Sequence, residues 1–154
     1  MLIREQPATE LTVATCILAR AGALAANGRI TLRLHDVVYV SARGVSNHTM
    51  TPYDVVSVLL ADGAPLIGDP PEDVDDYLAL HRRSPKAVSV ARAADGALVA
   101  GPSIRACTVA ILRSRRGETE RDDDATIERT WIELVSDARI AGALVGAFPH
   151  DPSP

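Results

Sequence analysis

Four histidines and two cysteines are the residues of this sequence best suited to nucleophilic or metal chemistry, and their spacing supports neither. The histidines lie at positions 35, 48, 81 and 150, none within metal-ligand spacing of another histidine or of a cysteine. Cys16 and Cys107 lie far apart in apolar surroundings, which is typical of buried core residues. The serine-nucleophile pattern GxSxG, the phosphate-binding GxxxxGKS/T, the dinucleotide-binding GxGxxG and the zinc-binding HExxH are all missing. Common enzyme motifs therefore do not locate a site.

The composition is that of one soluble globular domain, and we take residues 1–154 as a single domain. Hydrophobic residues make up 47% of the 154 residues and charged residues 23%. A net charge of −4 and an aromatic content of 3% argue against nucleic-acid binding. No apolar run approaches the ~20 residues of a membrane span, and the N-terminus lacks the apolar core of a signal peptide. We expect a cytoplasmic protein without nucleic-acid or membrane partners.

Hydrophobic periodicity predicts helices at both ends of the chain and mostly hairpin-linked strands between them. Asn27-Gly28 is expected to end the first helix, and Thr51-Pro52 to begin a short one. Helices are expected over 9–26, between Pro71 and Arg83, and over 125–148; strands are expected over 29–35, 37–40, 55–60, 65–67, 87–90 and 108–112. This order favours helices that cover an antiparallel or mixed sheet.

Three segments in the first half of the chain carry a family resemblance. They are NGRITLR at 27–33, VSARGVS at 40–46 and MTPYDVVSV at 50–58. In this order they resemble the class II aldolase/adducin family, whose pattern there runs Gly-Asn-x-Ser-x-Arg, Ile-Ser-Pro-x-Gly-Val-Ser and Met-Thr-Pro-x-Asp-hydrophobic. The family contains sugar-phosphate aldolases and a ribulose phosphate epimerase, and the similarity continues through 77–85 and weakly to the end. The resemblance implies an α/β fold: a three-layer α/β/α domain with a central mixed, mainly antiparallel sheet.

The resemblance also implies a substrate site. The family's phosphate-binding Gly-Asn becomes Gly28-Arg29. Ser41 and Gly44 match a loop that helps to bind substrate in the aldolases, and Arg43 lies between them. The catalytic acid falls on Asp73, or on its neighbour Glu72 if the register slips by one residue.

The family's metal-binding histidines are replaced in this sequence. A His-x-His pair on the strand after the second helix aligns with Val90 and Arg92, and a later histidine aligns with Arg115 or Arg116. A valine side chain has no donor atom, and a guanidinium has no lone pair to give to a metal. We therefore expect no metal and no other cofactor.

These residues lead to a functional hypothesis. Fixed guanidinium groups can stabilise a developing oxyanion in place of a metal. The sequence then predicts a metal-independent lyase, isomerase, cyclase or decarboxylase that acts on a small anionic substrate. Asp73 and Arg92 are the predicted catalytic residues. The predicted substrate-binding residues are Gly28, Arg29, Ser41, Arg43, Gly44 and Arg115.

Two other hypotheses remain. The chain could be a non-catalytic interaction or assembly module, with the C-terminal amphipathic helix and its Trp131 forming an interface. A zinc aldolase would need the ligands that are absent. The resemblance further implies a homo-oligomer, with a tetramer favoured, because the family's aldolases build their active sites between subunits.

Overall fold

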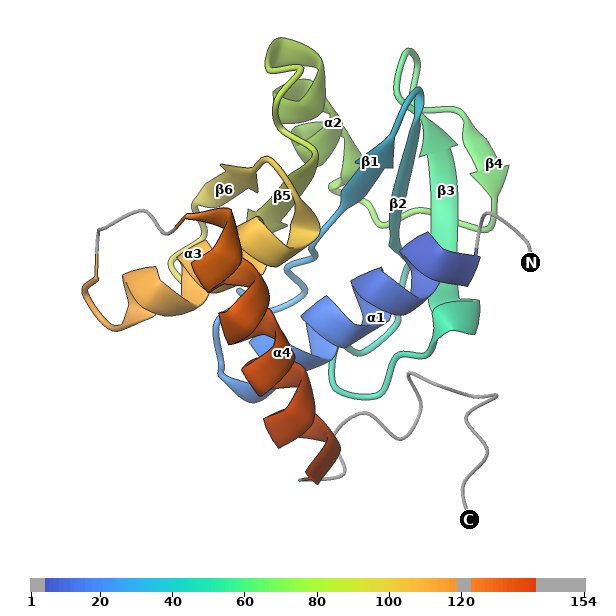
Figure 1. The fold of residues 1–154 in the computed structure, drawn as a ribbon. Helices are drawn as coiled ribbons and strands as arrows, with labels where there is room; N and C mark the ends of the chain where they lie inside the picture. The colour runs from blue at the N-terminus through green and yellow to red at the C-terminus, as the bar shows by residue number, and fades with distance from the viewer. Residues whose placement is uncertain (1–4, 119–122, 141–154) are drawn as a thin grey trace.

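The computed structural model describes residues 5–118 and 123–140 (Figure 1). Its helices are α1 (Glu5–Arg20), the short 3₁₀ helix η1 (Pro52–Asp54), α2 (Val74–Arg83), α3 (Ile104–Arg115) and α4 (Asp124–Ile140). Its strands are β1 (Leu32–Leu34), β2 (Val37–Ser41), β3 (Val55–Leu59), β4 (Pro65–Ile67), β5 (Ser89–Arg92) and β6 (Leu98–Gly101). The predicted stretch of the last helix beyond residue 140 lies outside the described residues. No helix in the described ranges is long and apolar enough to cross a membrane.

The first helix ends earlier than the sequence analysis expects. Gly22 has a φ of +65°, and it ends α1 in a Schellman motif. Its N–H donates to Ala19 O at 3.0 Å, and the Ala23 N–H donates to Leu18 O at 2.9 Å. The prediction that Asn27-Gly28 ends this helix is therefore wrong, because the earlier glycine already supplies the left-handed residue. Residues from about 23 to 29 are therefore not helical. They form an irregular turn that leads to Arg29 in the candidate site.

The strands pair in two sheets that are antiparallel throughout. The order β1-β2-β3-β4 forms a four-stranded sheet, and β5 and β6 form a hairpin. Register pairs Leu34 with Val37 and Ser41 with Val55, so the polar end of β2 lies at the start of β3. The hairpins at 32–41 and 55–67 are confirmed, but no parallel pair occurs among the described strands. A single central sheet with a helical layer on each side stays a prediction.

The segment before β1 runs antiparallel to β5 and links the two sheets. Isolated bridges join Leu24 to Ala93 and Ile30 to Ala91. The Arg92 N–H donates to Arg29 O at 3.0 Å, and the Thr31 N–H donates to Val90 O at 2.8 Å. This pairing sets Arg29 and Arg92, 63 positions apart in the chain, on neighbouring backbone segments.

Different residues of β2 contact α1 and α2. Val38 and Val40 join an apolar cluster with Val74 and Leu78 of α2. Tyr39, between them, packs instead against the cluster that contains α1. Because successive side chains of a strand point to opposite faces, α1 and α2 lie on opposite faces of the four-stranded sheet. In Figure 1, α2 lies at the top of the molecule, and α3 and α4 gather on the side away from β4.

The strand predicted over 108–112 is wrong, because this stretch lies inside α3. The Ser103 side chain accepts a hydrogen bond from the Ala106 N–H at 3.0 Å and so caps the helix. Ile104, Cys107 and Ile111 then recur at helical spacing and are buried in the α1 cluster. Strand β6, which precedes this cap in the chain and pairs with β5, is not among the strands predicted from the sequence.

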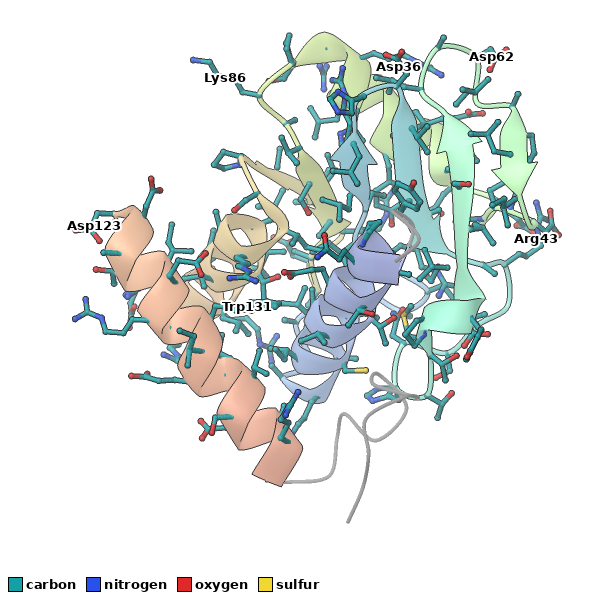
Figure 2. The ribbon with its side chains drawn as sticks, turned by 45° about the vertical axis from the view of Figure 1, so that its right-hand side comes forward. Asp36, Arg43, Asp62, Lys86, Asp123 and Trp131 are labelled. Atoms are coloured by element: carbon teal, nitrogen blue, oxygen red, sulfur yellow. The ribbon has the colours of Figure 1, made fainter. Side chains whose placement is uncertain are left out.

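The apolar side of α4 packs within the chain. Trp131 is only 5% exposed, and the Arg105 guanidinium lies over its ring at 5.5 Å from the centroid. Figure 2 shows Trp131 on the side of α4 that faces the rest of the molecule. Over the described residues, the expectation that Trp131 offers an apolar face to a partner is therefore wrong, because its own domain covers it.

Candidate functional site

An open pocket of about 940 Å³ lies where the turn after α1, the loop after β2 and the start of α2 meet. Its volume is in the range of small-molecule sites. Small apolar residues of α1 and the following turn form one wall, including Ala19, Leu24 and Ala25. The polar lining residues come from that turn, from 43–48, from the start of α2 and from β5. Five predicted site residues line this pocket: Arg29, Arg43, Gly44, Asp73 and Arg92, together with the alternative acid Glu72.

Arg29 is a cation at the pocket without a carboxylate partner. The residue is 4% exposed, and no described carboxylate lies within 4.0 Å of its guanidinium. Its Nη1 donates to three neutral acceptors: Val45 O at 2.6 Å, Ser41 Oγ at 3.1 Å and Asn47 Oδ1 at 3.3 Å. Its Nε is buried and has no acceptor among the described residues. Burial lowers the pKa of this guanidinium, partly offset by Tyr77 and Asp73, yet an arginine side chain stays charged at neutral pH.

Arg92 is surrounded by acceptors. Its Nε lies 3.4 Å from Asp73 Oδ2 and its Nη2 lies 2.9 Å from Asp76 Oδ2, while Nη1 donates to Gly96 O. The guanidinium also lies over the Tyr77 ring at 5.5 Å. Burial by itself lowers the pKa of Arg92, but Tyr77 and the two carboxylates outweigh it and the pKa is raised. Arg92 therefore fixes the position of Asp73 at the N-terminus of α2.

Arg43 and Gly44 form the exposed edge of the pocket. Arg43 Nε lies 3.4 Å from Asp69 Oδ2, and Nη1 lies 3.3 Å from Glu72 Oε1. Its side chain is about half exposed, and Figure 2 shows it at the edge of the molecule near β4, far from α4. Gly44 has a φ of +80°, which a glycine adopts without strain. Water screens these ion pairs, so Arg43 contributes little electrostatic attraction for a ligand and mainly positions the loop.

Gly28 and Ser41 lie behind the pocket lining and support it. Gly28 is buried, and its carbonyl accepts a hydrogen bond from Asn47 Nδ2 at 2.7 Å. Ser41 is 2% exposed and holds the Arg29 guanidinium from the end of β2. The structure thus places both next to Arg29 without exposing either to the pocket.

Arg115 and its alternative Arg116 lie outside the pocket lining. Both are exposed at the C-terminal end of α3, beyond the stretch 108–112 predicted as a strand. Arg115 Nη2 would lie 3.5 Å from a Cβ on Gly22, at the pocket margin. Arg116 lines a smaller groove between α1, α3 and α4.

Three residues that the sequence analysis does not select also belong to the site. Asn47 bridges Arg29 and Gly28, and His48 lines the pocket beside it. Tyr77 is fully buried, and its hydroxyl accepts a hydrogen bond from the Arg29 backbone N–H at 2.9 Å. Burial is the main cause that raises the pKa of Tyr77 and keeps it a neutral phenol. The sequence holds little signal for these residues, because an asparagine in a loop and a tyrosine on an apolar helix face are both common.

The residues present do not fit the metal that the family resemblance implies. Val90 is buried in a cluster with Tyr77 and Ala87, and Arg92 occupies the neighbouring position with a positive charge. Both ring nitrogens of His81 already have protein partners, Ala87 O and Thr31 Oγ1, each at 2.6 Å. Within the described ranges, no group of three or more histidine, cysteine, aspartate or glutamate side chains could hold a metal ion.

Comparison with solved structures identifies the fold. No protein-family model and no curated protein sequence matches the chain. L-fuculose 1-phosphate aldolase from Glaciozyma antarctica PI12 has a TM-score of 0.58 at 15% identity, over 94% of this chain and 89% of that one. YgbL, described as a proposed aldolase/epimerase/decarboxylase, matches with a TM-score of 0.53 at 19% identity in Klebsiella pneumoniae and 0.50 at 26% in Escherichia coli.

The YgbL matches are partial. They cover 60% and 58% of this chain, and the chain spans less than half of each YgbL chain, 46% and 44%. At these identities the likeness concerns the backbone arrangement. These solved structures have the class II aldolase/adducin-like fold, and this chain shares that fold.

Proposed function

We propose that this chain is a metal-independent enzyme that binds a small anionic molecule in the pocket beside Arg29 and transfers a proton with Asp73. The reaction would be of the lyase, isomerase, cyclase or decarboxylase type. The observation that carries the proposal is the buried Arg29 guanidinium, which lines a pocket and has no carboxylate of the described residues within 4.0 Å. A buried cation of this kind costs stability unless an anion joins it. A ligand carboxylate or phosphate would supply that anion.

Each pocket residue then has a distinct role. Arg29 binds the anionic group of the substrate through charge-assisted hydrogen bonds. Asp73, held by Arg92 at 3.4 Å, is the group that takes or gives a proton. Arg92 contributes a fixed positive charge beside the carbon or oxygen that gains electron density, which is the work that a metal would otherwise do.

The most direct test follows solvent hydrogen at a substrate carbon. Small carboxylic acids and phosphate esters are incubated with the full chain in D₂O, after treatment with a chelator, and deuterium incorporation is read by NMR. We expect exchange or turnover of at least one compound by the wild-type chain. We expect Asp73→Asn to abolish it while binding of the same compound is retained. Turnover that stops after chelation and returns with zinc would contradict the metal-independent part of the proposal.

Asp76→Asn is the matched control for Asp73→Asn. Asp76 bonds the same guanidinium from the same helix, but it does not line the pocket. This variant is expected to keep substantial turnover. If both variants lose activity equally, Asp73 has a structural role and not the proton-transfer role.

The second candidate function, a non-catalytic interaction module, keeps one observation in its favour. Ile132 of α4, next in the chain to the buried Trp131, is 64% exposed. If no compound is turned over and an Ile132→Glu variant loses a protein partner that the wild-type chain binds, this alternative is the better account.

A further inference from the structure

The three arginines that line the pocket differ in their carboxylate partners, and this difference affects which anion the pocket can bind. Arg43 is matched by Asp69 and Glu72, and Arg92 by Asp73 and Asp76. Of the three arginines in the described lining, only Arg29 has no carboxylate within 4.0 Å. Among the described lining residues, these three guanidinium groups face only the carboxylates of Glu72 and Asp73, which leaves one net positive charge, that of Arg29, before any ligand binds.

This balance suits a monoanion better than a dianion. One negative charge on the ligand pairs with Arg29, and a second would face Glu72 and Asp73, the two carboxylates of the described lining, whose own partners are already in place. A phosphate monoester carries close to two negative charges at neutral pH and presents three strong acceptor oxygens. A carboxylate carries one charge and presents two oxygens.

The negative charge at the start of α2 also works against a phosphate group. A helix N-terminus commonly binds phosphate through its free backbone N–H groups. Here the residues at the pocket before this helix are Pro71, which has no N–H, and Glu72 and Asp73, which bring negative charge. The acidic side chains therefore already occupy the favourable position at the positive end of the helix.

The apolar part of the pocket lining indicates the rest of the ligand. Ala19, Leu24, Ala25 and Ala26 line the pocket from α1 and the turn after it, with Gly22 among them. Alkyl side chains of this size leave room for, and favour, an apolar or weakly polar body.

We infer that the ligand of this pocket is a small monocarboxylate with an apolar body, its carboxylate bound to Arg29, and not a phosphate ester. This inference rests on the proposed function for the existence of an anion site and goes further by naming the class of anion.

The experiment compares two probes of similar size on the full ¹⁵N-labelled chain. Isobutyrate and methyl phosphate are titrated separately at about pH 7.5, where the ester is close to a dianion, and amide shifts are followed by NMR. We expect isobutyrate to shift Gly28, Arg29 and the 43–48 loop, with an affinity at least about tenfold above that of methyl phosphate. Arg29→Gln should weaken isobutyrate binding by about tenfold or more, the loss expected when a charged hydrogen bond is removed.

Two further variants keep the comparison interpretable. Arg83→Gln removes an exposed arginine at the far end of α2 and should leave both affinities unchanged. Arg29→Lys keeps the charge if Arg29→Gln does not fold, and it should still weaken isobutyrate binding several-fold because an ammonium cannot reproduce the guanidinium's planar set of donors.

The outcomes separate this inference from the proposed function. Binding of methyl phosphate equal to or tighter than that of isobutyrate, and dependent on Arg29, would overturn the monocarboxylate inference and leave the anion site standing. No Arg29-dependent binding of either probe would overturn both. Isobutyrate binding unchanged in Arg29→Gln and Arg29→Lys would place the carboxylate elsewhere and overturn the inference.

Discussion

Replacing Gly28 by alanine tests the turn that holds Arg29 against β5. A Cβ at this position would lie 2.9 Å from Ala25 O and 3.0 Å from Arg92 O, both backbone atoms. Carbon and carbonyl oxygen rarely approach so closely, so the turn and β5 must move apart by a few tenths of an ångström. The backbone φ of Gly28 is not in the left-handed region, and the cost is therefore steric.

Overpacking of this kind destabilises a domain by about 1–3 kcal/mol. For a domain of this size, that loss lowers the midpoint of thermal unfolding by roughly 2–12 °C. The same displacement changes the Gly28 carbonyl that accepts from Asn47 and the backbone next to Arg29. We therefore expect Gly28→Ala to unfold earlier and to bind isobutyrate more weakly.

Gly101→Ala is the matched control, because its Cβ would meet three atoms of Cys107 at 2.9 Å, far from the pocket. Circular dichroism melts and isobutyrate titrations on both variants give the comparison. Both should lose stability, and only Gly28→Ala should lose affinity. A melting temperature of Gly28→Ala equal to that of the wild type would refute the close packing of this turn on β5, and equal affinity losses would refute its specific link to the site.

Three further outcomes follow from buried groups and from the family resemblance. Burial lowers the pKa of His81 below its ordinary value of about 6.5, so the unfolded chain binds more protons there; stability should fall as the pH drops below about 6.5, with a weaker slope in His81→Asn by thermal melts. Burial raises the pKa of Cys107 to about 12 and that of Cys16 in the same direction, and neither thiol should react with a thiol reagent at about pH 8 until the chain unfolds. Light scattering should give a multiple of 16.3 kDa, with four copies favoured, and a particle of 16.3 kDa would contradict the proposed homo-oligomer.

Local patterns in the sequence predict the hairpins and α2 well. The alternation over 29–35 and the runs of valine in 37–40 and 55–60 are typical of strands, and each pattern can be recognised within its own segment. Acidic residues at the start of α2 and basic residues at its end match the helix dipole. These elements are confirmed to within a few residues.

The stretch 104–115 shows where local patterns mislead. Thr108, Val109 and Ile111 have the composition of a strand, and the structure places them in α3. The cap at Ser103 and the burial of this face against α1 decide the outcome, since tertiary packing outweighs a weak propensity. Arg115, whose predicted role rests on the family resemblance, lies exposed at the C-terminal end of the same helix and outside the pocket lining.

The candidate site is predictable in its parts but not in its balance of charge. The family resemblance selects Arg29, Arg43, Asp73 and Arg92 one by one, and all four line the same pocket. The resemblance does not indicate that Arg92 forms ion pairs with Asp73 and Asp76. These ion pairs depend on how the segment before β1 pairs with β5. The three arginines therefore look equivalent in the sequence and differ in the structure.

Arg29 is difficult to explain as a structural residue, and this difficulty supports a ligand. A buried arginine that only stabilises a fold usually pairs with a carboxylate, since burying a lone charge is costly. Three neutral acceptors surround Nη1, while the buried Nε has no acceptor in the part of the chain that the structure describes. An unmet donor of this kind costs about 1–3 kcal/mol in a folded protein. Aspartates are available nearby, yet the fold directs two of them to Arg92. An anion that enters from the pocket would give the buried charge of Arg29 the partner that the described residues do not supply, and this gain favours the bound state.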